Sequence, residues 1–581
     1  MAHVPRWRFG SLVLCLLMAA GLCGLAPGCR PGEPAPSSPE PAGRPWFRDV
    51  TDEVGLKFVH DPGPVGSHFM PQAIGSGAAL FDYDNDGRLD IYLVQNGGPG
   101  SKSTNRLFHQ GPDGRFQDVS RGSGLDVAGY GMGVAVGDVN NDGYPDVLVT
   151  EYGRVRLFLN NHGDGTFTDV TRDAGLDNLL WGTSAAFVDY DRDGWLDLVV
   201  VNYVDYDPSR SCADASGRPD YCSPSAFVGS VTRLFHNRGA VPGGKQPRVL
   251  FEDVTLKSGL GRLPGPGLGV LCADFDGDGW PDIFVANDAK PNRLWINRHD
   301  GTFSEEALTR GVAYNGLGLP QGNMGVAVGD VNGDGLFDLF VTHLTDESHT
   351  LWEQGPRGVF RDRTAAAGLA SPRWRGTGFG TVLADFDQDG APDLALVNGR
   401  VTYRPAPAEG VGDPFWTHYA ERNQLFANDG SGRFRDISAA NQPFCGQAAV
   451  SRGLAVGDVD GDGAPDLLVT TVGGPARLFR NVAPDRGHWL LVRALDPSRK
   501  RDAYGAEVTV RAGKRRWVQA VNPGHSFLCS SDPRAYFGLG QCTRVDAISV
   551  VWPDGTREVF PGRAADQGIV LCQGKGDRAP R

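Results

Sequence analysis

A nine-residue pattern, Asp-x-[Asp/Asn]-x-Asp-Gly-x-x-Asp, occurs seven times in this chain of 581 residues and constrains its fold more than any other feature. The copies, numbered here as turns 1 to 7, begin at Asp82, Asp138, Asp189, Asp274, Asp330, Asp385 and Asp458. Each copy lies between two short apolar stretches of the kind that forms β-strands. Seven matches are far more than average composition produces, so the pattern is a true repeat.

The spacing of the copies indicates the architecture. Successive copies begin 51 to 85 residues apart, which is room for one four-stranded sheet per copy. The chain has 81 glycines and 40 prolines, as expected for many turns, and its apolar residues lack the period of helices. We therefore predict an all-β fold: a seven-bladed β-propeller with Ca-binding hairpin turns over residues 46–481 and a small C-terminal β domain over residues 486–575. The longest spacings place insertions near residues 203–227 and 401–422.

The two ends of the repeat array predict how the ring closes. A fourth-strand pattern appears at residues 47–51, before any acidic turn, whereas the last copy runs only as far as a third strand at residues 477–481. We expect residues 47–51 to complete the last sheet, because closure removes open strand edges.

The acidic side chains of each turn are spaced as cation ligands. Oxygen-bearing side chains at positions 1, 3, 5 and 9, a glycine at position 6 and a carbonyl at position 7 match the loop of an EF-hand, although no Glu stands at position 12. Donors that are all oxygen favour Ca²⁺ over zinc or copper. The alternative is that Asp-Gly turns serve the backbone alone. That alternative explains one copy more easily than seven. Without residues 1–28, which contain Arg6 and Arg8, the formal net charge of −13 becomes −15, and seven divalent ions would neutralise nearly all of it.

The predicted calcium ligands come from all seven turns. In turns 1 to 4 they are Asp82, Asp84, Asp86 and Asp90; Asp138, Asn140, Asp142 and Asp146; Asp189, Asp191, Asp193 and Asp197; Asp274, Asp276, Asp278 and Asp282. In turns 5 to 7 they are Asp330, Asn332, Asp334 and Asp338; Asp385, Asp387, Asp389 and Asp393; Asp458, Asp460, Asp462 and Asp466. The two asparagines lower the charge but keep an oxygen ligand.

The N-terminal segment predicts export. Residues 1–28 read as a signal peptide, with Arg6 and Arg8 ahead of an apolar run, and the Ala-Pro-Gly before Cys29 resembles a bacterial lipobox. We expect an extracytoplasmic protein that is anchored to the cell envelope through a lipidated Cys29, or alternatively secreted. Residues 29–45 are rich in proline and are predicted to form a tether.

Seven cysteines follow Cys29, and an exported chain permits disulfides between them. Cys212 with Cys222 is the first candidate pair, and Cys529 with Cys542 is the second. Cys272 falls in a predicted strand, where it is expected to be a small buried apolar residue. The sequence has no Cys-x-x-Cys motif, which argues against redox and c-type haem functions of the usual form.

Through its acidic turns, the segment 46–481 resembles the FG-GAP/VCBS repeat propellers, which include the integrin α-subunit headpiece. The segment 486–575 resembles the ASPIC/UnbV domain at residues 488–490 (HWL), 501–508 (RDAYGAEV), 536–540 (YFGLG) and 551–555 (VWPDG). Together the two parts resemble the cartilage acidic protein-like family. The resemblance implies a fold and a calcium requirement more firmly than a reaction.

The sequence favours a binding function. It has no hydrolase or nucleotide-binding motif, and its negative charge disfavours nucleic acid. We predict a monomeric adhesion or binding module for an extracellular protein or polysaccharide. A lectin-type surface would expose aromatic side chains, for which Tyr403, Trp416 and Tyr419 are candidates. The alternative is a calcium-dependent propeller enzyme acting on polysaccharide, such as a lyase or dehydratase, for which no catalytic residues are assigned.

Two other segments have a functional and a structural interpretation. His343, Asp346, Glu347 and His349 resemble a metal or acid/base cluster, but the same place in other repeats is an ordinary strand connection. The basic run at residues 514–517 resembles a nucleic-acid contact, but one short run on a strand is usually a solvated edge. We prefer the structural interpretation of both.

Overall fold

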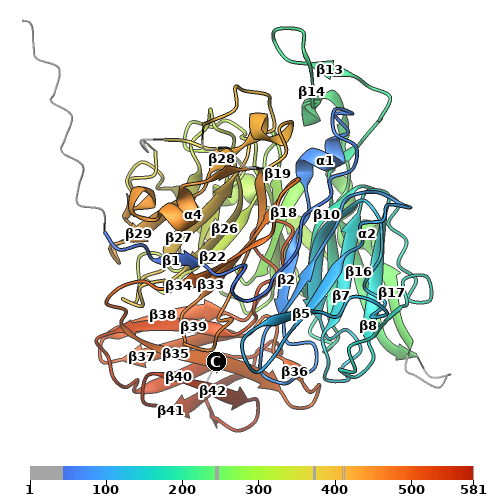
Figure 1. Ribbon diagram of the computed structural model, residues 1–581. Coiled ribbons are helices and arrows are strands. Elements are labelled where there is room, and N and C mark those ends of the chain that lie inside the picture. The colour runs from blue at the N-terminus through green and yellow to red at the C-terminus, as the bar shows by residue number, and fades with distance from the viewer. Residues whose placement is uncertain are drawn as a thin grey trace, which may run out of the picture. The chain divides into compact units, whose positions relative to one another are not determined.

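The computed structural model describes residues 43–241, 248–356, 358–370, 374–408, 410 and 412–579, which belong to one unit (Figure 1). The predicted signal peptide, Cys29 and nearly all of the predicted tether lie outside the described residues. Within them, none of the helices is long and apolar enough to cross a membrane. The fold is all-β, as predicted.

The repeat region forms seven four-stranded sheets among the described residues, each antiparallel throughout. The first three are β2 (Ala78–Phe81), β3 (Asp90–Leu93), β4 (Arg106–Gln110) and β5 (Phe116–Asp118); β6 (Gly131–Gly137), β7 (Asp146–Glu151), β8 (Arg154–Asn160) and β9 (Phe167–Asp169); and β10 (Gly182–Val188), β11 (Asp197–Asn202), β16 (Arg233–Val241) and β17 (Arg248–Asp253). The fourth and fifth are β18 (Gly267–Ala273), β19 (Asp282–Asn287), β20 (Arg293–Asn297) and β21 (Phe303–Glu305); and β22 (Val326–Gly329), β23 (Asp338–Val341), β24 (Thr350–Gly355) and β25 (Val359–Asp362). The last two are β26 (Gly378–Ala384), β27 (Asp393–Asn398), β29 (Gln424–Asn428) and β30 (Phe434–Asp436); and β32 (Ser451–Gly457), β33 (Asp466–Thr471), β34 (Arg477–Asn481) and β1 (Phe47–Asp49).

Strand β1 completes the last sheet, as the two ends of the array predict. It pairs antiparallel with β34, so that Phe47 lies opposite Asn481 and Asp49 opposite Phe479. The side chain of Arg477 reinforces this pairing, because its Nη2 lies 2.6 Å from Oδ2 of Asp49. The N-terminal and C-terminal parts of the array are thereby joined in one sheet.

The first strands of the seven sheets contact one another in a closed cycle. The order of contacts is β2, β6, β10, β18, β22, β26, β32 and again β2. Apolar side chains fill the space between each pair of neighbouring sheets; between the first two, Tyr92, Val147 and Phe158 are fully buried. The core of the repeat region is therefore divided into layers between sheets.

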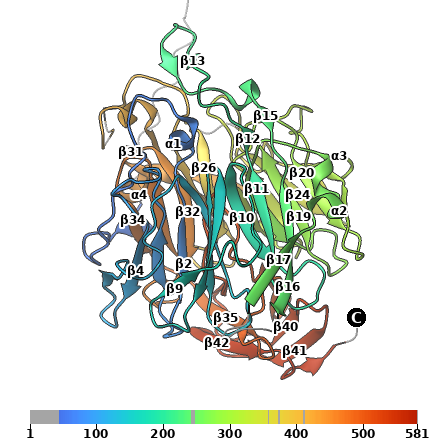
Figure 2. The same ribbon diagram turned by 90° about the vertical axis from the view of Figure 1, so that its right-hand side faces the viewer.

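The C-terminal region forms a separate pair of sheets, drawn in orange and red in Figures 1 and 2. One sheet contains β36 (Arg501–Asp502), β35 (His488–Asp496) and β39 (Ala535–Gly540), with β42 (Gln567–Cys572) parallel to β35. The other contains β38 (Arg515–Ala520), β37 (Glu507–Ala512), β40 (Ala547–Val551), β41 (Arg557–Pro561) and β43 (Asp577–Arg578). We call this region, residues 486–579, the C-terminal domain.

A loop of the C-terminal domain, residues 521–534 between β38 and β39, enters the centre of the ring of sheets; we call it the central loop. It forms hydrogen bonds with the first strand of every sheet. The ring residues involved are Ala78 and Leu80 of β2, Val134 of β6, Ser184 of β10, Cys272 of β18, Val326 of β22, Thr381 of β26 and Val456 of β32. One loop therefore contacts all seven sheets.

The short helix α1 (Met70–Ile74) meets the central loop on the axis of the ring. Met70 and Ile74 belong to the same apolar cluster as Phe527 and Leu528 of the loop. Buried side chains of the first strands, such as Met132, surround them. The axis of the ring is thus filled by packed side chains from α1, the central loop and the first strands.

The remaining elements are short and decorate the ring. They are α2 (Thr255–Ser258), α3 (Ala307–Arg310), α4 (Gln442–Cys445), the 3₁₀ turns η1 (Pro224–Ala226), η2 (Leu260–Arg262), η3 (Trp416–Tyr419) and η4 (Ser438–Ala440), and the strand pairs β12 (Val204–Asp205) with β15 (Val228–Gly229), β13 (Cys212–Ala213) with β14 (Pro219–Asp220), and β28 (Glu421–Arg422) with β31 (Ala448–Ala449). Most of these strand pairs and η1 and η3 belong to the two predicted insertions.

Candidate metal centres in the acidic turns

Each acidic turn joins the first and second strands of its sheet and adopts the same backbone conformation. Position 4 is left-handed in every copy, with φ of 60° at Asn85 and 78° at Gly277, and the glycine at position 6 also has positive φ, 91° at Gly87. These conformations favour Gly and Asn, which explains the residue types at both positions except Arg192 and Gln388 at position 4.

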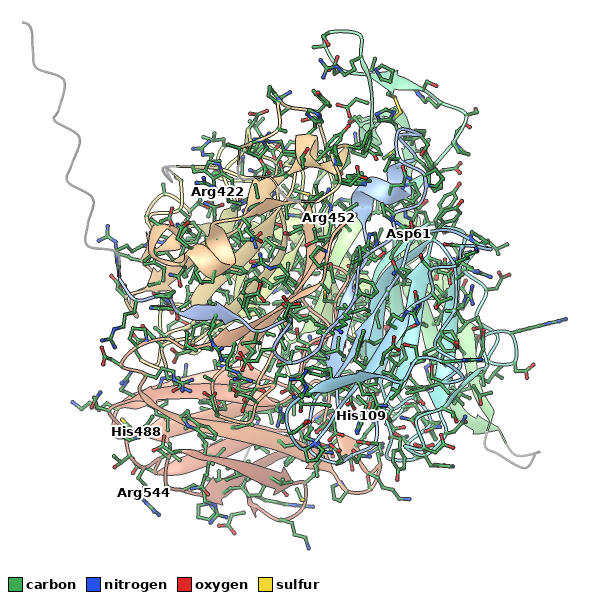
Figure 3. All side chains as sticks on the ribbon, viewed as in Figure 1. Asp61, His109, Arg422, Arg452, His488 and Arg544 are labelled. Carbon is green, nitrogen blue, oxygen red and sulfur yellow. A yellow bond between two sulfur atoms is a disulfide. The ribbon has the colours of Figure 1, made fainter. Side chains whose placement is uncertain are left out.

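In Figure 3, the labelled His109, which adjoins turn 1, lies beside the C-terminal domain.

The carboxylate at position 1 holds the turn closed. In turn 1, Oδ2 of Asp82 accepts a hydrogen bond of 3.0 Å from the amide of Gly87. The equivalent bond is 2.6–3.0 Å long in the other six turns. In turns 1, 2, 5, 6 and 7, the amide of position 5 donates to the side-chain oxygens of both positions 1 and 3. The predicted ligands at these two positions therefore lie close together.

The aspartate at position 9 is buried in every turn and links the turn to the third strand. In turn 1, Asp90 accepts hydrogen bonds from the amides of Tyr83 (3.2 Å) and Gln110 (2.9 Å). All seven turns contain both bonds. This residue was predicted only as a cation ligand, and the structure adds a role in shaping the backbone.

The carboxylates of several turns lie close enough to share one cation. Ligand oxygens of Asp82, Asp84 and Asp90 all fall within 4.8 Å of one another, and the same holds for the equivalent residues of turns 3 and 4. Burial, with the neighbouring Asp84 and Asp82, raises the pKa of Asp90 to about 8. Burial raises the pKa of Asp82 to about 6. Without a cation, these carboxylates are costly to ionise.

Turn 3 contains a buried carboxylate oxygen without a partner. Asp189 is 6% exposed, and its Oδ1 has no hydrogen-bond donor among the described residues. In five other turns the amide at position 5 donates to this oxygen of position 1, but in turn 3 the amide of Asp193 donates to Asp191. A buried anionic oxygen left unpaired is costly, and a cation bound among oxygen donors would remove that cost. The residues of the turn therefore fit a divalent cation, as the sequence predicts there.

The C-terminal domain lies against the acidic turns. Arg515 donates to the carbonyl of Asp389 (3.0 Å), Trp517 Nε1 to that of Gly390 (3.0 Å), and Arg516 to that of Asp334. These carbonyls belong to positions 5 and 6, and not to position 7, where a ligand is predicted. Residues 514–516 are exposed at the edge strand β38, as we preferred, but Arg515, Arg516 and the buried Trp517 also contact turns 5 and 6.

Two recurring polar residues escaped the sequence prediction. An Asn or Gln at the end of the third strand donates 2.8–2.9 Å hydrogen bonds to the position 2 carbonyl of the preceding turn, as Asn160 does to Tyr83. This amide link occurs at six of the seven junctions, and at the seventh Nε2 of Gln354 has no partner among the described residues. The residue at position 4 also links neighbours, as Asn85 donates to Gly143. The recurring Asn or Gln after the Leu-Phe or Leu-Trp pair was visible in the sequence.

The two insertions come together at the other end of the sheets. Cys212 and Cys222 form the predicted disulfide (S–S 2.08 Å). Asp220 accepts hydrogen bonds from the hydroxyl of Tyr419 and the amide of Tyr403, both 2.9 Å long, which join the first insertion to the second. A groove of about 520 Å³ beside the disulfide is lined by aromatic and polar side chains. The labelled Arg452 lies toward this end in Figure 3.

Three smaller predictions are corrected or supported at these sites. Cys529 and Cys542 are both free, so the second predicted disulfide was wrong; Cys272 is buried, as predicted. Trp416 and Tyr419 are only 2% and 1% exposed, because they pack in the aromatic core of the insertions, so they form no lectin-type surface.

The segment with His343 and His349 connects β23 to β24, as we preferred, and the side chain of His343 is buried. The amide of His343 donates to Nδ1 of His349 (2.9 Å), and the imidazole of His343 lies 3.0 Å from Oγ1 of Thr350. Burial lowers the pKa of His349 to about 4. Both side chains support the loop from inside it.

Comparison with known families agrees with these features. Residues 82–149, 138–200, 274–341 and 410–469 match the FG-GAP-like repeat, and residues 496–578 match the domain described as ASPIC and UnbV. The chain therefore combines FG-GAP-like repeats with an ASPIC and UnbV domain. The resemblance drawn from the sequence is confirmed.

Similar proteins share most of the chain. Cartilage acidic protein 1 of Xenopus tropicalis is 26% identical over 557 residues, covering 89% of this FG-GAP and ASPIC/UnbV protein and 75% of its relative. The Homo sapiens protein of the same name is 26% identical, covering 88% and 72%. The names of these relatives and families indicate no catalytic family.

Two solved structures show weaker similarity. One is an Agrocybe aegerita lectin described with non-reducing terminal N-acetylglucosamine, with 16% identity and a TM-score of 0.36, covering 69% of this chain and 94% of that chain. The other is BBS1N in complex with ARL6DN, with 10% identity and a TM-score of 0.39, covering 76% and 98%. TM-scores this low support no conclusion about this chain.

Proposed function

We propose that this chain is a calcium-stabilised binding module that works outside the cytoplasm. Its seven sheets would be the blades of a closed β-propeller, an arrangement supported by the cycle of contacts between first strands and by the pairing of β1 with β34. The C-terminal domain would fasten the ring through the central loop. Lipidation of Cys29 would attach the module to the cell envelope.

Ca²⁺ would be held in the acidic turns by the side chains at positions 1, 3, 5 and 9. The observation that carries this proposal is the grouping of carboxylates in turns 1 and 4, where ligand oxygens at positions 1, 3 and 9 lie within 4.8 Å of one another. A bound divalent ion supplies the positive charge that lets the crowded carboxylates stay ionised. The carboxylates at positions 1 and 9 also accept hydrogen bonds from backbone amides, which hold the turn in its conformation.

The partner would bind at the end of the sheets away from the acidic turns. There the two insertions join through Asp220, the disulfide braces one of them, and the aromatic groove offers a concave surface. Binding sites are commonly concave and carried by loops on a rigid scaffold. We therefore propose an extracellular protein or polysaccharide as the partner, with no chemical reaction.

Metal removal tests the proposal. Stripping the purified protein with a chelator should lower its melting temperature, and added Ca²⁺ should restore it. Calorimetric titration should show binding at the acidic turns. The variant Asp84→Asn, which copies the natural asparagines of turns 2 and 5, should keep its ion, whereas Asp84→Leu should lose one equivalent. An unchanged melt in the chelator, with no metal recovered from the protein, would remove the basis of the proposal.

A further inference from the structure

Turn 3 combines two features: an imidazole beside its carboxylates and the unpartnered oxygen of Asp189. His236 extends from β16, where its Nδ1 lies 3.0 Å from Oδ1 of Asp197 and 3.4 Å from Oδ2 of Asp191. The imidazole is 12% exposed, so water competes little for its nitrogens. The strand therefore presents a nitrogen donor to a turn in which the sequence predicts only oxygens.

The donors of turn 3 form one continuous cluster. Ligand atoms of Asp189, Asp191 and Asp197 lie within 4.8 Å of one another, and so do those of Asp191, Asp193 and His236. Asp191 belongs to both groups, so the imidazole of His236 adjoins the carboxylate group that contains Asp189. The unpartnered Oδ1 of Asp189, on a side chain that is 6% exposed, is an independent indication of a cation ligand.

We propose that turn 3 binds a borderline divalent transition ion, Zn²⁺, with His236 as its nitrogen ligand. The inference rests on the proposed function, since it assumes that the acidic turns bind divalent cations. Ca²⁺ takes oxygen ligands, whereas a mixed set of imidazole and carboxylate donors suits zinc and cobalt. Ligation at Nδ1 requires only that the ring proton sit on Nε2, so no proton is gained or lost by the neutral ring.

The other turns provide internal comparisons. His109 occupies the same strand position beside turn 1, 3.1 Å from Asp90, but Oδ1 of Asp82 already accepts a hydrogen bond from Asp86. His162 touches the position 5 carboxylate of turn 2 and is 64% exposed, while His299 touches that of turn 4 and is 43% exposed. Turn 3 alone among these four has both an enclosed imidazole and an unpartnered buried oxygen within the described residues.

Cobalt titration of the full-length protein in excess Ca²⁺ tests the inference. Co²⁺ serves as the probe because it occupies zinc sites and its visible absorption reports on ligands. We expect one equivalent to bind in the presence of about 1 mM Ca²⁺, a concentration that fills extracellular calcium sites. Added Zn²⁺ should displace it. Failure of Co²⁺ to bind under these conditions would overturn the inference.

Variants separate a ligand from a supporting residue. His236→Ala should weaken Co²⁺ binding about 100-fold or more, and His236→Gln, which keeps a hydrogen-bond donor toward Asp197, should not restore it. The matched variants His109→Ala and His299→Ala should retain the tight equivalent and its spectrum. Restoration by glutamine, or loss caused by His109→Ala instead, would contradict the assignment.

The same samples distinguish this inference from the proposed function. Each histidine variant should keep the rise in melting temperature produced by Ca²⁺, because the other turns are unchanged. If Ca²⁺ stabilises all variants but the substitutions of His236 leave Co²⁺ binding unchanged, only the assignment of the zinc site is wrong. If Ca²⁺ stabilises none of them, including the wild type, the proposed function itself is wrong.

Discussion

The acidic turns join the first and second strands of all seven sheets, whereas the two insertions join the second and third strands of only two sheets and lie at the other end. The turn end repeats one set of backbone hydrogen bonds seven times and is covered by the C-terminal domain. The insertion end has its own disulfide, aromatic packing and groove. A repeated end provides a uniform scaffold, and an irregular end provides specificity.

The two ends also depend on different physics. At the turn end, carboxylates, backbone amides and arginines of the C-terminal domain lie close together, so stability there should depend on charge and on the proposed metal ions. At the insertion end, aromatic rings pack around a few buried hydrogen bonds. Changes in pH and metal should therefore affect the turn end first, and the predictions below use this difference.

The largest effect should come from pH in the metal-free protein. Burial raises the pKa of Asp90 to about 8 and that of Asp189 to about 7, above the value of about 4 for an unfolded carboxyl group. The folded state then binds protons more tightly than the unfolded state. The resulting stability is complete below about pH 4 and is lost as the pH rises through about 7 to 8.

Metal-stripped protein should therefore melt about 10 °C or more lower at pH 8 than at pH 6. Ca²⁺ takes the place of the protons, so the loaded protein should show a much smaller difference over the same range. Differential scanning calorimetry at both pH values, with and without Ca²⁺, measures this. A metal-free protein that melts higher at pH 8 would reverse the sign and contradict the account of the turns.

Truncating the side chain of Phe527 in the central loop should have the next largest effect on stability. Phe527 is fully buried on the axis of the ring, with its ring centroid 5.0 Å from that of Phe379. Phe527→Ala should lower the free energy of unfolding by about 3–5 kcal/mol in urea titrations. Val228 of the first insertion is 72% exposed, and Val228→Ala should change it by no more than about 0.5 kcal/mol. Equal effects would show that the central loop does not fasten the ring.

The amide links offer a smaller and more selective test of the turn end. Asn428 donates to the carbonyls of Val331 (2.8 Å) and Pro392 (3.0 Å), whereas Nε2 of Gln354 has no partner among the described residues. Asn428→Leu should cost about 2–3 kcal/mol, because it leaves buried carbonyls unpaired. Gln354→Met removes no such bond from Nε2 and should cost less than about 1 kcal/mol. Urea unfolding of the pair measures the difference, and a larger loss for Gln354→Met would contradict the role of the link.

The difference between the two ends also explains how much the sequence could predict. The strand order, the closing strand β1 and the grouping of the turn carboxylates follow from a local pattern that the chain repeats, so each copy supports the others. The predicted ligands at position 9 were recognised by their charge, but their hydrogen bonds to the third strand require knowledge of which strands are neighbours.

Residues that act across long sequence distances were not predictable. Nothing near Arg516 indicates that it meets Asp334, because the C-terminal domain follows the whole array in sequence. Trp416 and Tyr419 were expected on the surface since they lie in an insertion, yet two insertions packed together bury them. The pairing of Cys212 with Cys222 was predictable because both lie in one insertion. Cys529 and Cys542 do not pair, since the first lies in the central loop and the second follows β39.

The smallest effect should come from the hydrogen bond that joins the insertions. The hydroxyl of Tyr419, which is 1% exposed, donates to Asp220 at 2.9 Å, whereas the hydroxyl of Tyr403 lies 3.3 Å from Nε2 of His418. Tyr419→Phe should cost about 1.5 kcal/mol, because a buried hydrogen bond to a carboxylate is lost, and Tyr403→Phe less than about 0.5 kcal/mol. Since this bond lies at the insertion end, Ca²⁺ should raise the melting temperature of Tyr419→Phe as much as that of the wild type. Thermal melts with and without Ca²⁺ measure this, and a reduced calcium response in Tyr419→Phe would show that the two ends are coupled.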